Sequence, residues 1–346
     1  MTTAQTLAAG TSAFFSSLGF KDVVMKPAPT TQLMALLGRK GFGKSSIVQS
    51  CPRAIIINAD CSSTVTKGPC KALMWPGVRK NGTPVRPNPQ FPNDPEKGTP
   101  VVMSWPLIDS FVDELVKHAG DPHRPEMVAI DTIDTIVSLL REWWVDEVNK
   151  DRAAMTPPQD PATSFADLNA MLYVPKIAEQ LSSMVKRLRA AGYGVCMIFH
   201  LGDKTKYENR GGVNTSYQVE DEPLVSDSIW NRLVPGLAET SGIVHRYLKE
   251  VPVMIPKKGP GGVPILNPQT KKPVLVPNGE KTTEIAVALQ FDATPGKYKD
   301  ACKSRVQMGV VQITPDDPWG CFERAYNKAV DELHQIEETS PPSTSA

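Results

Sequence analysis

The sequence predicts an α/β fold with a mainly parallel central sheet, and three observations lead to this class. Short apolar runs alternate with segments of helical periodicity over most of the chain, as in sheets whose strands are connected through helices. A glycine-rich turn joins the first such run to the first helical segment. The 346 residues include 40% hydrophobic side chains, enough to bury a core, and their composition excludes collagen-like, coiled-coil and disordered chains.

The first half of the predicted core alternates strand and helix three times. Short apolar or β-branched runs predict the strands, and apolar residues at every third or fourth position predict the helices. In chain order these elements are a strand at 32–37, a helix ending at Gln49, a strand at 53–58, a helix at 106–119, a strand at 127–130 and a helix at 133–148.

The second half continues this alternation and ends in a hairpin and a helix. In chain order the elements are a helix at 173–188, a strand at 194–199, a polar loop at 203–226, a helix at 229–238, strands at 242–250 and 283–292, and a helix at 319–336. The loop is expected to follow the strand directly after His200.

Prolines are concentrated in residues 76–100 and 252–277, with seven in each stretch. Because proline breaks helices and cannot donate to a central ladder, both stretches are interpreted as inserted loops or extended arms. They either cross the surface or contact a partner or DNA. The second stretch and its flanking strands predict one long hairpin.

Five segments follow from these signals. They are an N-terminal lead segment at 1–30, a core at 31–251 with a proline-rich insertion at 61–100, a proline-rich arm at 252–280, a C-terminal strand and helix at 281–338 that complete the core, and a disordered tail at 339–346.

Charge and cysteine usage limit the possible partners. The 38 Lys and Arg against 37 Asp and Glu leave a net charge of +1, so a nucleic-acid site must be a local cluster. Six cysteines form no C-x-x-C pair and no zinc spacing with five histidines, so we expect reduced thiols and no structural metal. A cationic leader and a long apolar run are both missing, which predicts a cytoplasmic protein without a membrane partner.

The strongest motif is Gly38-Arg-Lys-Gly-Phe-Gly-Lys44-Ser45, which matches G-x-x-x-x-G-K-[ST] between a strand and a helix. In such a P-loop, backbone N–H groups surround the phosphates, the lysine reaches the β and γ phosphates, and the serine hydroxyl ligates Mg²⁺. The alternative is a glycine-rich turn with an incidental lysine. The expected nucleotide contacts are Gly38, Gly41, Phe42, Gly43, Lys44, Ser45 and Ser46.

Three predicted strand ends supply further candidates. Asp131 follows four apolar residues and is expected to ligate Mg²⁺ with Ser45, or to cap the next helix. Asp60 is a candidate for orienting the attacking water, or it starts a turn. His200 is a candidate sensor of the γ-phosphate, or a structural residue. Asp134 is expected to be solvated or to cap the helix.

Two basic clusters suggest contacts beyond the nucleotide. Within 203–226, Lys204, Lys206, Tyr207 and Arg210 combine cations and rings, as single-stranded DNA requires, although a mobile solvated loop explains them equally well. Near the C-terminus, Lys303 and Arg305 could stabilise the γ-phosphate of an adjacent subunit, or form a solvated basic turn.

The order of these motifs resembles the RecA-like ATPases of bacteriophages, in particular the single-strand-annealing proteins with a minimal RecA core. The residues that carry the likeness are the P-loop, Asp60, Ile130-Asp131-Thr132, Val195-Cys-Met-Ile-Phe-His200 and Lys303-Ser304-Arg305, and it covers about residues 33–311. The resemblance implies a RecA-like core that binds ATP, Mg²⁺ and single-stranded DNA, oligomerises as a ring or filament, and works beside a single-strand-binding protein, in the host cytoplasm if phage-encoded. RecA proteins generally carry glutamate where this chain has Asp60, which puts rapid hydrolysis in doubt.

Two further functions remain open at this stage. One is a nucleotide-switched interaction or assembly protein with little turnover. The other is a helicase or packaging motor, which chain length disfavours because no second motor domain is visible.

Overall fold

The computed structural model describes residues 28–61, 72–91, 94–210, 213–291 and 308–339. Its main sheet consists of β1 (Leu33–Gly38), β2 (Ala54–Asn58), β3 (Leu73–Trp75), β7 (Met127–Asp131), β8 (Gly194–Arg210), β9 (Val213–Pro223), β10 (Thr240–Pro256), β11 (Leu275–Gln290) and β12 (Val310–Ile313). The strand order is β12-β11-β10-β1-β8-β7-β2-β3, and β9 pairs with β8 outside this path. The pairs from β10 to β3 are parallel, which confirms the predicted fold class.

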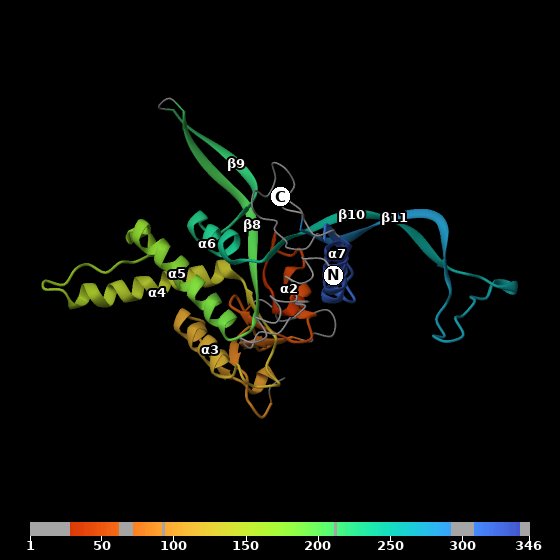
Figure 1. Ribbon diagram of the computed structural model, residues 1–346, viewed down its shortest axis with the longest axis horizontal. Coiled ribbons are helices and arrows are strands. Elements are labelled where there is room, and N and C mark those ends of the chain that lie inside the picture. The colour runs from red at the N-terminus through yellow and green to blue at the C-terminus, as the bar shows by residue number, and fades with distance from the viewer. Residues whose placement is uncertain (1–27, 62–71, 92–93, 211–212, 292–307, 340–346) are drawn as a thin grey trace, which may run out of the picture.

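Helices cover both faces of this sheet (Figure 1). The helices are α2 (Lys44–Gln49), α3 (Trp105–Lys117), α4 (Ile133–Ala154), α5 (Ala170–Ala190), α6 (Asp227–Leu237) and α7 (Pro318–Thr339), with short 3₁₀ turns at Pro29–Thr31, Pro95–Lys97, Phe165–Asp167 and Pro260–Gly262. Helices α3 to α6 share one buried cluster, while α2 and α7 share the cluster on the opposite face. The architecture is therefore three layers, helix, sheet and helix.

The period-2 alternation of the strands explains how one sheet serves both layers. In β1, Leu33, Ala35 and Leu37 pack against the α3–α6 layer, and Met34 and Leu36 pack against α2 and α7. Since alternate residues of a strand face the two helical layers, all residues of the strand must be apolar. This is the pattern of parallel strands that are buried on both faces.

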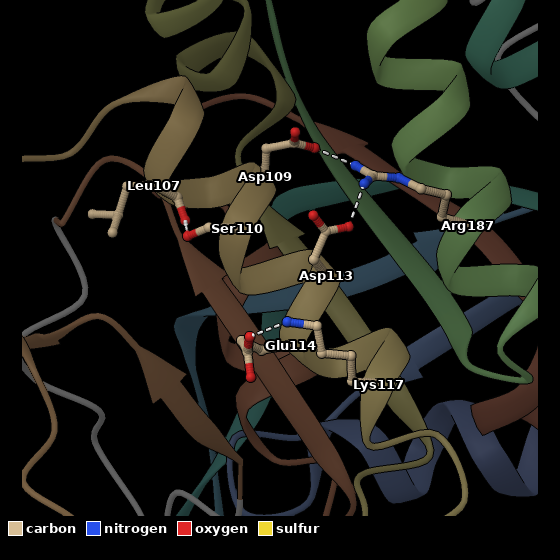
Figure 2. A network of polar contacts seen from close by, with 7 residues as sticks. All are labelled: Leu107, Asp109, Ser110, Asp113, Glu114, Lys117 and Arg187. Atoms are coloured by element: carbon tan, nitrogen blue, oxygen red, sulfur yellow. Dashed lines mark hydrogen bonds and ion pairs between the residues drawn. The ribbon is translucent and has the colours of Figure 1, made fainter.

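Ion pairs join α3 to α5 within the α3–α6 layer (Figure 2). The Arg187 guanidinium of α5 donates to Asp113 at 2.6 Å and to Asp109, which lies one helical turn earlier on α3. On α3 itself, Lys117 pairs with Glu114 at 2.7 Å. Arg187 is thus shared by two carboxylates of the neighbouring helix.

The expectation of a polar loop at 203–226 was wrong, because most of these residues form an antiparallel hairpin. Strand β8 continues to Arg210, and β9 returns from Val213 with Arg210 opposite Val213 and Leu201 opposite Pro223. The sequence contains a signal for a hairpin here, since a Gly-Gly dipeptide at 211–212 is typical of two-residue connections between antiparallel strands. The hairpin projects beyond the sheet (Figure 1).

The two proline-rich stretches have different structures. Residues 76–100 contain a small antiparallel sheet of β4 (Gly77–Val78), β5 (Pro84–Arg86) and β6 (Thr99–Pro100), which the sequence analysis did not predict. The long hairpin predicted around 252–277 is confirmed: β10 and β11 pair from Ile243↔Gln290 to Pro256↔Leu275 and extend far from the core (Figure 1). Among the helices of the described ranges, none combines the length and apolarity needed to cross a bilayer.

Candidate nucleotide-binding site

The candidate residues meet at the carboxyl ends of four neighbouring parallel strands. Gly38 at the end of β1 is opposite His200 of β8, and Asn58 at the end of β2 is opposite Asp131 of β7. In open α/β sheets this edge is where ligands bind. The tertiary fold therefore brings together residues that are more than 160 positions apart in the sequence.

Glycine is required at two turns of the P-loop. Gly41 and Gly43 have φ values of +81° and +97°, in the left-handed region that side chains with a Cβ atom rarely adopt. Gly43 precedes α2 directly, so the loop turns into the helix at this residue. The predicted contact Phe42 is half-buried against the α2–α7 layer, and Ser46 is exposed on α2.

Lys44 lies inside the loop and not on the surface. Its side chain is 4% exposed, and Nζ donates to the carbonyl oxygens of Gly38 at 2.7 Å and Arg39 at 2.9 Å. Burial lowers the pKa of Lys44 to about 8, and the charge of Asp131 opposes this shift. A buried ammonium group among backbone carbonyls is a strong point charge for a phosphate at this loop.

Ser45 and Asp131 form a pair of oxygen donors beside Lys44. The Ser45 hydroxyl donates to the Asp131 carboxylate, which is 3% exposed. Burial raises the pKa of Asp131 to about 6, and a cation would favour its ionised form. Magnesium prefers oxygen ligands of these two types, so the pair fits the predicted metal site. The alternative in which Asp131 caps α4 is wrong, because Thr132 is the cap and its hydroxyl accepts from Thr135 N–H.

His200 and Asp60 lie around this pair. The charge of Asp60 raises the pKa of both Asp131 and His200, so the three groups share one neighbourhood. Burial is the main reason that the pKa of His200 falls to about 4, and the imidazole is therefore neutral at physiological pH. Asp60 itself lies two residues beyond β2, in a turn.

The expectation that Asp134 is solvated or a cap was wrong. Its side chain is 16% exposed, Oδ2 accepts the backbone N–H of His200 at 2.8 Å, and the same oxygen lies 3.5 Å from His200 Nδ1. Because parallel strands bring β8 beside β7, the first turn of α4 reaches the end of the neighbouring strand. Asp134 thus holds His200 at the sheet edge.

Asn58 is a site residue that the sequence analysis missed. It is fully buried, and neither Oδ1 nor Nδ2 has a hydrogen-bond partner among the described residues. Residues paired across neighbouring strands project to the same face, so its amide lies beside the carboxylate of Asp131, on the face covered by α2. The available signal was a polar residue that closes the run Ile55-Ile56-Ile57.

Arg39 connects the P-loop to the β8–β9 hairpin. Its guanidinium donates to Asp203 of β8 and to Asp221 of β9, each at 2.6 Å. A second arginine, Arg246 of β10, donates to the carbonyl oxygen of Gly41 at 3.0 Å. Two long hairpins are thereby attached to consecutive parts of one phosphate loop.

The remaining predicted residues do not all fall in described parts of the chain. Lys204 Nζ donates to the carbonyl oxygen of Val225 at 2.7 Å, which fixes it at the base of the β8–β9 hairpin. Lys206, Tyr207 and Arg210 belong to β8, but their side chains lie outside the described ones. Lys303 and Arg305 lie outside the described residues altogether, as do residues 340–346 of the predicted tail and residues 1–27 of the lead segment.

Comparison with known proteins places this site in a family. No curated protein matches the sequence. A family model described as an AAA domain matches residues 30–233, from the segment before β1 into α6. This range is more than half of the chain and includes the P-loop, Asp131 and His200, so the chain belongs to the AAA domain family of P-loop ATPases.

Proposed function

We propose that this ATPase hydrolyses ATP with Mg²⁺ and couples the nucleotide state to single-stranded DNA held by the β8–β9 hairpin, as an annealing or recombination protein does. The observation that carries the proposal is Arg39, a P-loop residue that is bonded to both strands of the hairpin. A structural hairpin would need no such contact with the phosphate loop.

The chemistry requires charge compensation and an oriented water. Lys44 and the backbone N–H groups of the P-loop bind the β and γ phosphates, and Ser45 and Asp131 hold the cation. When bound, Mg²⁺ would supply positive charge that stabilises the negative charge developing on the phosphates. Asp60 accepts a hydrogen bond from the attacking water, and neutral His200 donates one to the γ-phosphate or to that water.

Two paths lead from the phosphates to the hairpin. His200 belongs to β8 and is followed directly by the part of β8 that pairs with β9. Arg39 lies between Gly38 and the phosphate-facing turn of the loop and pairs with the same hairpin. A phosphate that repositions either residue shifts the hairpin, whose sequence combines cations with tyrosines.

The test is an ATPase assay with and without an oligonucleotide of single-stranded DNA. We expect DNA to stimulate wild-type turnover and Lys44→Ala to abolish turnover in both conditions. Arg39→Gln should keep its basal turnover and lose most of the stimulation, because the substitution removes the ion pairs with Asp203 and Asp221 and keeps the backbone carbonyl of residue 39 that Lys44 contacts.

Two controls separate the parts of the proposal. Replacing Lys206 and Arg210 by Ala should weaken DNA binding and reduce its dependence on salt, by about 0.7 in the logarithmic slope for each lost phosphate contact. If DNA does not affect turnover, the assignment of the β8–β9 hairpin as a DNA-binding element is wrong. If the protein binds ATP tightly and does not turn it over, a nucleotide-switched assembly protein is favoured.

A further inference from the structure

The β10–β11 hairpin beyond the sheet, residues 247–285, exposes much apolar surface. Nine of the eighteen large hydrophobic side chains that are exposed in the described residues lie on it. They are Tyr247, Leu248, Met254, Ile255, Val263, Ile265, Leu266, Leu275 and Ile285. Exposed apolar surface of this kind marks an interaction site, and an isolated two-stranded hairpin is at best marginally stable in water.

The distal part of this hairpin, residues 251–279, is also purely basic, and we call it the arm. It contains four lysines and neither Asp nor Glu, in a chain of net charge +1. The lysines are Lys257, Lys258, Lys271 and Lys272, and all four are exposed. The arm has no aromatic residue or histidine, so it offers no ring on which a nucleic-acid base could stack.

The prolines of the arm indicate how a partner is contacted. Seven prolines lie between Pro252 and Pro277, and three of them, Pro252, Pro256 and Pro277, belong to β10 or β11, where they offer no backbone N–H to a further strand. Strand addition to these edges is therefore disfavoured. The side chains of the arm are then the groups that remain to contact a partner, and a groove of complementary charge would receive them.

A groove with complementary properties lies between α3 and α4. Its volume is about 660 Å³, and its apolar wall includes Trp105, Leu139 and Trp143. Glu142, Asp146 and Glu147 supply acidic groups, and only Lys150 adds a positive charge, which Glu147 binds at 2.6 Å. An acidic rim around an aromatic wall fits aliphatic side chains flanked by lysines.

The arm and the groove belong to opposite sides of the molecule. In Figure 1 the arm extends from β10 and β11 on one side of the sheet, and α4 extends on the other. The arm therefore cannot reach the groove of its own chain. We propose that the arm of one subunit docks in the α3–α4 groove of a second copy, in a head-to-tail contact that can close a ring or continue as a filament.

Charge reversal tests this contact in the full-length chain. The arm variant carries Lys257→Glu, Lys258→Glu, Lys271→Glu and Lys272→Glu, and the groove variant carries Glu142→Lys and Asp146→Lys. Each variant alone places like charges at every contact and should weaken self-association by a factor of about 10 or more in sedimentation experiments with Mg-ATP. An equimolar mixture should assemble, because each arm then meets a groove of opposite charge.

Two measurements keep the result independent of folding and of the proposed function. Both variants should bind ATP like the wild type, since no mutated residue belongs to the nucleotide site. The double variant Lys80→Glu, Lys186→Glu is the control for a general change of surface charge, and its self-association should equal that of the wild type. Assembly of the separate variants at wild-type strength, failure of the mixture, or a monomeric wild type would overturn the proposal. Loss of binding to anionic lipid vesicles in the arm variant, with assembly unchanged, would assign the arm to a membrane surface.

Discussion

At the scale of single residues, the site contains polar groups whose burial is costly, and each has a measurable consequence. An amide or imidazole removed from water without adequate partners destabilises the fold, whereas the same group can be held ready for a ligand. Asn58 and His200 are the two clearest cases, because one is unpartnered within the described structure and the other is held neutral.

Replacing Asn58 by Leu should separate stability from function. The buried amide costs about 1–3 kcal/mol when unsatisfied, so Asn58→Leu should keep or raise the melting temperature. If the amide supports Asp131 or the water shell of the cation, the affinity for Mg²⁺ in the presence of ATP should fall about 10-fold. Ser182→Ala, which alters a buried polar group of α5, should leave this affinity unchanged. A less stable Asn58→Leu protein with normal Mg²⁺ affinity would make Asn58 purely structural.

The pH dependence of unfolding should report on His200. Its folded-state pKa of about 4 lies below that of an unfolded histidine, so the unfolded chain takes up the proton first. The contribution of His200 to stability is complete above pH 6.5 and is lost as the pH falls toward 4. In His200→Gln the decrease in unfolding free energy from pH 7 to 4.5 should therefore be smaller, by about 2 kcal/mol.

Chemical denaturation at the two pH values measures this difference, and NMR titration of the His200 imidazole gives a direct midpoint. An identical pH dependence in both proteins, or a midpoint near 6.5, would show that burial does not lower the pKa of His200 in the folded state.

At the scale of elements, we expect ion pairs that join two different elements to contribute more to stability than ion pairs within one helix. Arg187 joins α5 to two carboxylates of α3, and Arg39 joins the P-loop to two strands (Figure 2 shows the first case). In both cases the arginine also keeps two acids from repelling each other.

Arg187→Ala should lower the free energy of unfolding by about 1 kcal/mol, because two facing carboxylates lose their common partner. Lys117→Ala is the matched control, since its pair with Glu114 lies along α3 alone and is solvated. We expect no measurable change for this control in denaturant titrations. Equal stability of the two variants would mean that packing alone docks α3 on α5.

At the scale of the whole molecule, the proposed assembly predicts that some charged groups act across a subunit boundary. Lys303 and Arg305 are predicted to stabilise the γ-phosphate of a neighbour. The double variant Lys303→Ala, Arg305→Ala and the variant Lys44→Ala should each be inactive alone, and an equal mixture should regain part of the turnover.

ATP binding by the cation variant should remain normal, because these charges act mainly in the transition state. Normal turnover of that variant would reduce the cluster to a solvated turn. If the two variants exchange subunits in the mixture and turnover does not recover, Lys303 and Arg305 act on the P-loop of their own subunit.

The sequence alone determined the features that depend on neighbouring residues. The P-loop, the strand before Asp131, the helical stripe that buries Ile133, Ile136, Val137 and Leu140, and the long β10–β11 hairpin all have local signals in spacing or composition. Such signals reflect periodicity and backbone preference, which act within a few residues.

Only the tertiary structure decided which of these residues meet. The strand order places β8 between β1 and β7, so His200 lies opposite Gly38 and beside Asp134, and β2 brings the amide of Asn58 beside Asp131. Pairing between strands that are distant in sequence is set by the packing of the whole sheet, which no local pattern encodes. For the same reason the link from Arg39 to the β8–β9 hairpin, and the separation of the arm from the groove, could not be predicted from the sequence.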